Sequence, residues 1–161
     1  MKRKSVRIYS FTGTGSRLAL NLAEKLKQEG YVCTGYTVAR FAEDKRLQRL
    51  NDGWKQEIGA SWGEHALVFI GAAGIAIRAI APFVKDKFTD PPVIVLDEKG
   101  TFAIPLLSGH VGGGVTLAKV LAEYTGGRAV ITTATDVQKK IAADVFAKKN
   151  VLVITDREEA K

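Results

Sequence analysis

One of the two histidines stands in a glycine-rich segment, residues 105–115, which reads PLLSGHVGGGV. Glycine loses more conformational freedom on folding than any other residue, so four glycines close together indicate that bare backbone is needed there. Ser108 and His110 suggest a serine–histidine nucleophile pair, but they lie two positions apart on one loop and lack the G-x-S-x-G turn. A histidine alone is more often a packed or solvated residue than a catalyst, but the glycines allow a ligand to approach the backbone closely. His110 could then act as a general base on water, while the amides of Gly112, Gly113 and Gly114 receive negative charge.

A second glycine turn, GAAGIAIR, carries Gly71 and Gly74 where a predicted strand passes into a helix, and Arg78 follows one helical turn later. Unpaired amides at a helix start attract anions, and an arginine adds a bidentate contact to a carboxylate. The alternative is close packing of strand on helix beside a solvated arginine. From the residues alone both interpretations stay open.

Hydroxyl and carboxylate side chains follow the predicted strand RAVITT in the segment VITTATDV. Thr132 and Thr133 are expected to face a ligand cleft. Thr135 and Gln138 fit the spacing of a capping box that opens a last helix, and capping also accounts in part for Asp136.

The turn TGTGSRL suggests dinucleotide binding, because it follows a strand and opens a helix. Gly13 and Gly15 supply G-x-G, but Leu18 stands where the third glycine belongs, and no acidic residue follows the second strand where ribose binding needs one. A phosphate or carboxylate on this helix start is conceivable. A tight structural turn is the preferred interpretation.

The chain has 161 residues, of which 46% are hydrophobic and 25% charged. This composition is typical of a globular protein, and the length suits one domain with its own core. The longest apolar runs, HALVFIG and PPVIVLD among them, are far too short to cross a membrane, and the chain opens on no signal-type stretch. The single cysteine, Cys33, forms no internal disulfide, so we expect a cytoplasmic protein with a buried, inert thiol.

A formal net charge of +7 favours anionic partners. The basic residues are dispersed and form no zinc-finger, RRM or basic-helix pattern, so no nucleic-acid partner is expected. A polyanionic small molecule or an acidic protein explains the charge equally well, and dispersed charge also serves solubility. No cluster of histidine, cysteine and carboxylate residues has metal-ligand spacing, and the other histidine, His65, is expected to be structural.

Strand-like and helix-like segments alternate along the chain. This alternation predicts an α/β fold, a Rossmann-like three-layer sandwich with a mainly parallel twisted sheet and helices on both faces. Strands are expected at 5–12, 31–38, 66–71, 91–97, 101–107, 128–133 and 151–156, and helices after Ser16, within 40–65, around 75–84, at 113–125 and after Thr135. Such sheets bind ligands where strand carboxyl ends meet glycine-rich turns, so we expect the loops 12–16, 71–74, 107–114 and 132–136 to form one cleft.

A long run of specific motifs resembles the CbiG family of anaerobic cobalamin biosynthesis. The run covers residues 69–122, FIGAAGIAIRAIAPFVKDKFTDPPVIVLDEKGTFAIPLLSGHVGGGVTLAKVLA, and continues in AVITTATDV. The resemblance is strong over residues 66–150 and weak over the first sixty-five. It implies a cobalt-precorrin-5A hydrolase, which opens the ring-contraction δ-lactone of the macrocycle and releases acetaldehyde to give cobalt-precorrin-5B.

The resemblance also implies what the candidate residues would do. Precorrins carry many acetate and propionate carboxylates, so Arg78 with Lys85 or Lys87 is expected to hold substrate carboxylates. The amides of residues 112–114 or 72–74 are the expected oxyanion donors. The remaining expected binding residues are Gly71, Gly74, Ser108, Gly109, Thr132, Thr133 and Asp136. Cobalt arrives within the substrate and the protein binds no cofactor itself, although a role of His110 as axial cobalt ligand competes with its role as base.

Family members usually continue into a C-terminal domain similar to CobE. The chain is therefore expected to be an N-terminal part, folded as one domain over 1–161 or with 136–161 as the start of a central or linker segment. Expected partners are the cobalt-precorrin macrocycle, a CobE-like domain or chain and neighbouring pathway enzymes, and a homodimer is left open. The alternative function is a non-catalytic corrinoid-binding or assembly module, and nucleotide binding through GTGS is a third hypothesis.

Overall fold

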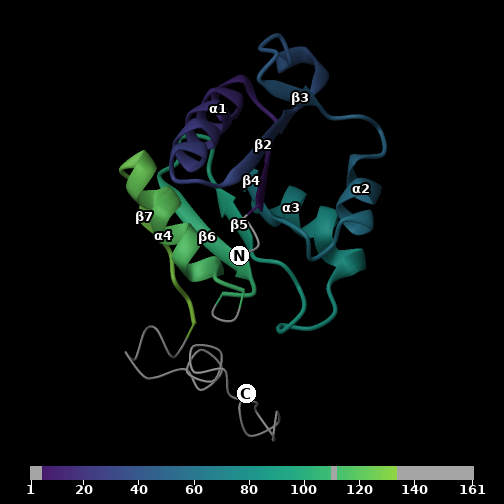
Figure 1. Ribbon diagram of the computed structural model, residues 1–161, viewed down its shortest axis with the longest axis vertical. Helices are drawn as coiled ribbons and strands as arrows, with labels where there is room; N and C mark the ends of the chain where they lie inside the picture. Colours follow the sequence, from purple (N-terminus) through teal and green to yellow (C-terminus); the bar gives the residue numbers. More distant parts are fainter. Residues whose placement is uncertain (1–4, 110–111, 134–161) are drawn as a thin grey trace, which may run out of the picture.

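The computed structural model describes residues 5–109 and 112–133, and these form one sheet with helices on both faces (Figure 1). The strands are β1 (Ser5–Ser10), β2 (Val32–Thr37), β3 (Leu47–Arg49), β4 (Ala66–Ile70), β5 (Val93–Leu96), β6 (Phe102–Leu107) and β7 (Arg128–Ala129). The α-helices are α1 (Gly13–Gln28), α2 (Trp54–Ala60), α3 (Ala73–Ile80) and α4 (Gly114–Thr125), and short 3-10 turns follow β2 (η1, Ala39–Phe41) and α3 (η2, Ala81–Phe83).

The strand order is β3-β2-β1-β4-β5-β6-β7. Strands β1 to β5 are parallel, whereas β6 is antiparallel to β5 and β7 is parallel to β6. The predicted α/β fold with a mainly parallel sheet is therefore confirmed. We call the edge where β1–β5 end the carboxyl edge, and the edge where they begin the amino edge.

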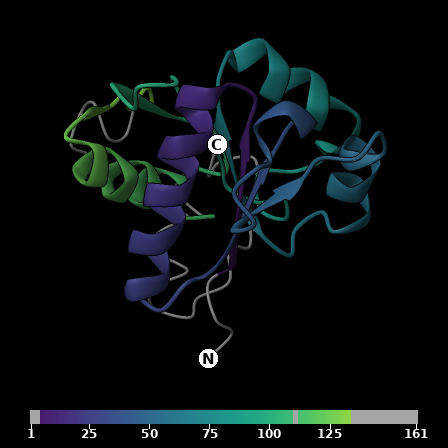
Figure 2. The same ribbon diagram turned by 90° about the horizontal axis from the view of Figure 1, so that it is seen from above.

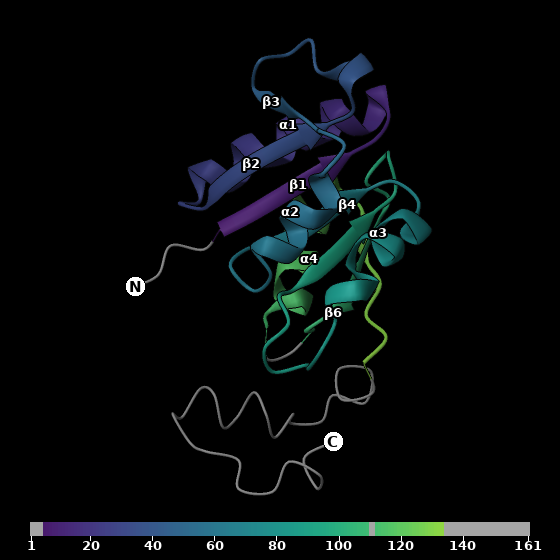
Figure 3. The ribbon, with the colours of Figure 1, turned by 90° about the vertical axis from the view of Figure 1, so that its right-hand side faces the viewer.

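Each face of the sheet has its own core, because successive strand residues point to opposite sides. On one face Ile8 and Ile70 pack with Leu22 of α1 and Leu121 of α4, and all four are fully buried. The other face packs its strand side chains, such as Phe69, against α2 and α3. Figures 2 and 3 show the resulting three layers, with α1 and α4 on one side of the sheet and α2 and α3 on the other.

The segment 40–65 differs from its prediction as one interrupted helix. The helix was predicted from an apolar stripe of Leu47, Leu50, Trp54 and Ile58, interrupted at Gly53. Leu47 lies in β3, at the sheet edge, and only Trp54 and Ile58 of this stripe lie in a helix. Leu47 packs directly over Gly35 of β2, where an added Cβ would come within 2.5 Å of the leucine Cδ2 atom. The position of Leu47 is thus determined by pairing with β2 and not by the helical spacing of the apolar residues. A strand of three residues is too short to show the alternation of apolar and polar residues that would predict it.

A hairpin reverses the chain between β5 and β6 at residues 98–100, where Glu98 and Gly100 predict either a hairpin or a sharp turn. Gly100 adopts a φ of 73°, which favours glycine, and its amide donates to the Asp97 carbonyl at 2.9 Å. Because β6 runs back, its last residue Leu107 pairs with Val93, the first residue of β5. The segment after β6 therefore lies at the amino edge.

Three smaller expectations can be compared with the structure. The residue that caps α1 is Thr12 rather than Ser16, since the Thr12 hydroxyl accepts the Gly15 amide at 3.0 Å. Cys33 is buried, as predicted, and burial raises the pKa of its thiol to about 11. In the described part of the chain no helix is long and apolar enough to span a membrane. The predicted helix after Thr135 and strand at 151–156 lie outside the described residues.

Candidate functional site

The predicted site residues fall into two groups at opposite edges of the sheet, so the expectation of one shared cleft is wrong. Gly71, Gly74 and Arg78 follow β4 at the carboxyl edge. The amino-edge group comprises Lys85, Lys87, Ser108, Gly109, Gly112, Gly113, Gly114, Thr132 and Thr133. Lys85 and Lys87 lie at the amino edge because they precede β5. The residues after β6 and β7 reach the same edge because these two strands run opposite to β5. His110 and Asp136 lie outside the described residues.

At the amino edge a buried carboxylate, that of Asp90, organises the loop before β5. It accepts hydrogen bonds from the main-chain amide of Lys85 at 2.9 Å and of Asp86 at 3.1 Å, and from the Trp62 indole at 2.9 Å. The Ser108 hydroxyl donates to the Asp90 carbonyl at 2.7 Å. These bonds join the residues before β5 to those after β6.

The glycines after β6 close a tight turn of the backbone. The Gly114 amide donates to the Ser108 carbonyl at 3.1 Å, and a Cβ at Gly112 would come within 2.5 Å of the Ser108 Cβ. Ser108 has a φ of 52°, the one positive value among the described residues that are not glycine. Gly112 and Gly114 are thus required because a side chain at either position would collide with Ser108 or its neighbours within the turn. The prediction was different, namely that these glycines let a ligand approach the backbone.

The other predicted residues at this edge are partly or fully exposed. Lys85 and Lys87 have exposed side chains, and the Lys87 ammonium lies 4.9 Å from the centre of the Phe88 ring. Thr132 is exposed, while Thr133 lies beside Gly109. Asp90 therefore connects the loop that carries Lys85 and Lys87 to the turn after β6, and all of these residues lie at the amino edge. Arg78 lies at the carboxyl edge.

At the carboxyl edge the turn between β1 and α1 is a structural one. The Thr12 hydroxyl accepts the Gly15 amide and donates to the Glu98 carboxylate at 2.8 Å. A Cβ at Gly15 would lie 3.2 Å from the Ile70 Cγ2 atom, so the glycine allows α1 to approach β4 closely. This geometry agrees with the preferred interpretation of the TGTGSRL turn.

The turn between β4 and α3 places Gly71 and Gly74 beside a pocket. Gly71 adopts a φ of 151° and donates its amide to the Leu96 carbonyl at 2.9 Å, which ties the turn to β5. In the first turn of α3, the Gly74 carbonyl accepts a hydrogen bond from the Arg78 guanidinium at 3.1 Å. Arg78 therefore folds back along its own helix towards the carboxyl edge.

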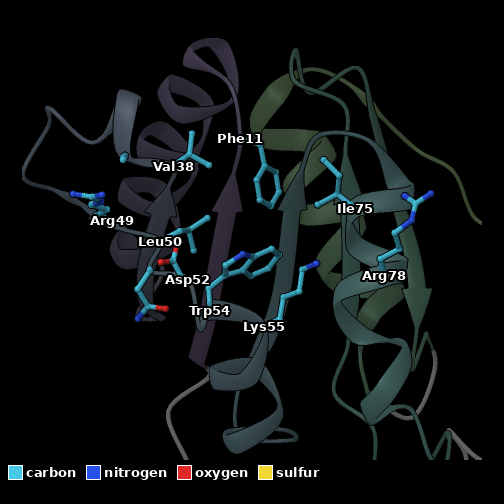
Figure 4. Close-up of a pocket in the computed structure, with 11 residues that line it drawn as sticks. Phe11, Val38, Arg49, Leu50, Asp52, Trp54, Lys55, Ile75 and Arg78 are labelled. Carbon is cyan, nitrogen blue, oxygen red and sulfur yellow. The ribbon is translucent and has the colours of Figure 1, made fainter.

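A pocket of about 540 Å³ opens at this edge, close to the ends of β1, β2 and β3 and the start of α3 (Figure 4). We call it the carboxyl-edge pocket. Its lining residues are Phe11, Val38, Ala39, Arg49, Leu50, Asn51, Asp52, Trp54, Lys55, Ile75 and Arg78. The chain leaves β1 for one face of the sheet and β4 for the other, so the pocket lies near the topological switch point where such sheets bind ligands.

Aromatic rings form the middle of the carboxyl-edge pocket. Trp54 and Phe11 are tilted against each other with ring centroids 5.7 Å apart, and Trp54 also rests on Tyr9 at 5.8 Å. Tyr9 is buried between Tyr36 of β2 and Phe69 of β4, stacking on both. Burial raises the pKa of Tyr9 to about 12, so the phenol stays neutral beneath the pocket at physiological pH.

Charged side chains surround these rings. Arg49, Lys55 and Arg78 are exposed cations, and Asp52 is the one carboxylate among the lining residues. Figure 4 shows Arg49 and Arg78 on opposite sides of the pocket, with Trp54 and Lys55 between them. Such an arrangement can accept an anionic ligand that also offers an apolar face.

Sequence reasoning identified Arg78 and the turn before it, but missed Phe11, Arg49, Trp54 and Lys55. Trp54 was assigned to a core stripe within the predicted helix 40–65, and one of its contacts, with Tyr9, does belong to the core. The available signal was a tryptophan and a lysine side by side at the start of a short helix, close to the end of a strand. His65 is structural as predicted, since its Nδ1 atom lies 2.7 Å from the Ser5 hydroxyl.

Comparison with known proteins identifies relatives of this chain. The chain is 40% identical over 157 residues to a cobalt-precorrin-5A hydrolase of Salmonella typhimurium, and 33% identical over 153 residues to one of Priestia megaterium. These alignments cover 91% and 92% of this chain but only 40% of each relative. The chain thus spans about two-fifths of the length of the curated relatives it matches.

A solved structure and a family model agree with these relatives. A cobalamin biosynthesis protein G homolog from Sulfolobus solfataricus superposes with a TM-score of 0.62 at 24% identity, covering 97% of this chain and 43% of the other, and so supports the fold. The family model for the N-terminal region of cobalamin synthesis protein G matches residues 58–136, from within α2 to beyond β7. The chain belongs to the CbiG family.

Proposed function

We propose that the chain is the N-terminal part of a cobalt-precorrin-5A hydrolase and acts in cobalamin biosynthesis. One observation carries this proposal: two relatives named for that activity align with more than nine-tenths of the chain, at 40% and 33% identity. The proposed reaction is the opening of the ring-contraction δ-lactone by water, with release of acetaldehyde and formation of cobalt-precorrin-5B. Cobalt is carried within the substrate.

The proposed chemistry needs a base for water and donors for the developing negative charge. We retain His110 as the proposed base, with the axial cobalt ligand as its competing role. The chain enters α4 at the amino edge through Gly113 and Gly114. The Gly114 amide donates to the Ser108 carbonyl, so the amides of Gly112 and Gly113 remain as the proposed donors of this turn. Lys85 and Lys87 lie at that edge and suit substrate carboxylates. The amides of residues 72–74, the alternative donors, and Arg78 lie at the other edge.

A CobE-like domain or chain is the proposed partner, because the matched relatives are more than twice as long as the aligned region. The same observation favours a second candidate function, in which this part binds the corrinoid and another domain performs the hydrolysis.

An acetaldehyde assay tests the proposal. The chain is incubated without oxygen with cobalt-precorrin-5A, alone and with an added CobE-like domain, and acetaldehyde is measured with alcohol dehydrogenase and NADH. The proposal expects acetaldehyde in at least one of the two mixtures. A change in the visible spectrum without acetaldehyde in either mixture would overturn it and favour the binding module.

The His110→Ala variant tests the proposed base in whichever mixture is active. Loss of turnover with retained substrate binding supports the general-base role. Turnover at the unchanged rate shows that His110 is not the base.

A further inference from the structure

We propose that the carboxyl-edge pocket binds a flat macrocycle that carries carboxylates, with the ring against Trp54 and Phe11 and the carboxylates on Arg49, Lys55 and Arg78. The identification of this macrocycle as a cobalt-precorrin rests on the proposed function in its second form, in which this part binds the corrinoid and another domain performs the hydrolysis. Lys85 and Lys87, the candidate carboxylate ligands of the first form, lie at the opposite edge of the sheet. The preference for a flat anion rests on the side chains of the pocket itself.

The aromatic contact is pre-formed. Trp54 is half-buried, and its position is set by Tyr9 behind it and by Phe11 at its side. Tyr9 is in turn held in the stack that crosses β2, β1 and β4. A large ring therefore finds an ordered aromatic surface, and little side-chain entropy is lost when it binds.

The cations come from three separate elements, which spaces them around the aromatic centre. Arg49 ends β3, Lys55 is the second residue of α2, and Arg78 lies in α3 (Figure 4). Within residues 5–109 and 112–133, none of the three forms an ion pair with a carboxylate, while Asp52 is the single acidic lining residue. A ligand with carboxylates distributed around its rim matches this pattern of positive charge better than a single phosphate does.

The size and place of the pocket fit a ring that is only partly enclosed. Its volume of about 540 Å³ lies within the usual range of roughly 300–1,000 Å³ for ligand sites. A tetrapyrrole with its acid side arms is larger than this space, so one part of the ring enters the pocket and the charged arms reach the exposed cations at its rim.

The test uses uroporphyrin, a flat tetrapyrrole with acetate and propionate arms, as the probe. The chain contains two tryptophans, and they report on opposite edges, since Trp54 lines the pocket and the Trp62 indole binds Asp90 at the amino edge. In a ¹H–¹⁵N spectrum, assigned with Trp54→Phe and Trp62→Phe, uroporphyrin should shift the Trp54 indole signal and leave that of Trp62 in place. A shift confined to Trp62 would overturn the proposal without the need for any other variant.

Affinity measurements provide the second arm, read from the change in uroporphyrin absorbance. Lys55→Gln and Arg49→Gln should each weaken binding about two- to fivefold, as expected for exposed ion pairs, and Trp54→Leu about tenfold. Lys119→Gln on α4 and Arg128→Gln in β7 are the matched controls, because both are exposed and distant from the pocket. Equal loss in controls and pocket variants would refute the site.

A porphyrin with cationic N-methylpyridinium arms tests the charge argument. It offers a similar ring with the opposite charge, so it should bind much more weakly, and the affinity for uroporphyrin should fall as salt is added. Equal affinity for both porphyrins contradicts the proposal.

The outcomes separate this inference from the proposed function. Unchanged hydrolysis of cobalt-precorrin-5A by Trp54→Leu and Lys55→Gln, with unchanged KM, would refute the pocket and leave the proposed function intact. Uroporphyrin binding at Trp54 without any acetaldehyde from cobalt-precorrin-5A would refute the proposed hydrolase activity and leave the pocket intact.

Discussion

The hydroxyl of Ser108 donates a hydrogen bond of 2.7 Å to the main-chain carbonyl of Asp90. This bond connects the turn after β6 to the loop before β5, and the Asp90 carboxylate holds that loop through two amides and the Trp62 indole. The position of the whole amino-edge turn thus depends on a residue with a positive φ of 52°.

Replacing Ser108 should separate its hydrogen bond from its backbone strain. Ser108→Ala loses the bond and keeps the strained φ, so the free energy of unfolding should fall by about 1 kcal/mol. Ser108→Gly loses the same bond but relieves the left-handed strain, which also amounts to about 1 kcal/mol, so it should stay close to wild type. Urea denaturation of both variants checks this order, and a glycine variant less stable than the alanine variant would contradict it.

Two neighbouring glycines should respond differently to alanine. A Cβ at Gly112 would lie 2.5 Å from the Ser108 Cβ and 2.8 Å from its carbonyl oxygen, so Gly112→Ala should cost about 2 kcal/mol or more. At Gly113, with a φ of 84°, an added Cβ meets no described atom within 4 Å, and Gly113→Ala should cost about 1 kcal/mol. Thermal unfolding of the two variants measures the difference. Equal losses would show that the turn does not close as described.

The cap of α1 should contribute to stability through Thr12. Thr12→Ala removes the acceptor of the Gly15 amide and the bond to Glu98, and should lower the free energy of unfolding by about 1–2 kcal/mol. Thr12→Ser keeps the hydroxyl and serves as the control. Glu98→Gln keeps an acceptor for Thr12 and should change stability by less than about 0.5 kcal/mol. A serine variant as unstable as the alanine variant would assign the effect to the threonine methyl group.

His65 should make the protein less stable in mild acid. Burial, followed by the positive charge of Arg7, lowers the pKa of His65 below 6.5, against the opposing effect of Glu64. Below pH 6.5 the unfolded chain therefore binds a proton more readily than the native protein, and the free energy of unfolding falls with pH. The stabilisation by His65 is present above pH 6.5 and is lost as the pH falls through the native pKa.

The matched variant for this pH effect is His65→Asn. The difference in stability between wild type and the variant should shrink as the pH falls below 6.5. The titrating carboxylates are common to both chains, so the difference reports on His65 alone. Urea denaturation at several pH values provides the measurement. A difference independent of pH would show that the native and unfolded pKa values of His65 are equal.

Most of the sheet could be predicted from apolar runs between glycine turns. The run ALVFI forms β4, which is buried on both faces. Glu98 and Gly100 indicated a hairpin or a sharp turn between two strands, and the structure has the hairpin. The strand β3 could not be recognised, since its register is set by Leu47 packing over Gly35 rather than by a local pattern. Sequence periodicity reports burial within one element, and it carries no information about which strand pairs at an edge.

The candidate site could be predicted only in part, and for two physical reasons. The rule that places ligands at strand carboxyl ends holds for parallel strands, and the antiparallel β6 moves Ser108 to the other edge. Trp54 serves two purposes, since it packs on Tyr9 and also lines the pocket, and spacing along the chain indicates only the first. Arg78 was found because a glycine turn opens its helix.

The reversal at β6 also makes the two edges separable for protein engineering. A strand of four to six residues spans roughly 13–20 Å at about 3.3 Å per residue, beyond the distance of about 7–10 Å at which mutational effects couple. Substitutions around Trp54 and around Ser108 should therefore combine additively in free energy. A library of variants can therefore randomise the pocket and the turn at the same time. The effect of the pocket substitutions on stability can then be determined independently of the effect of the turn substitutions.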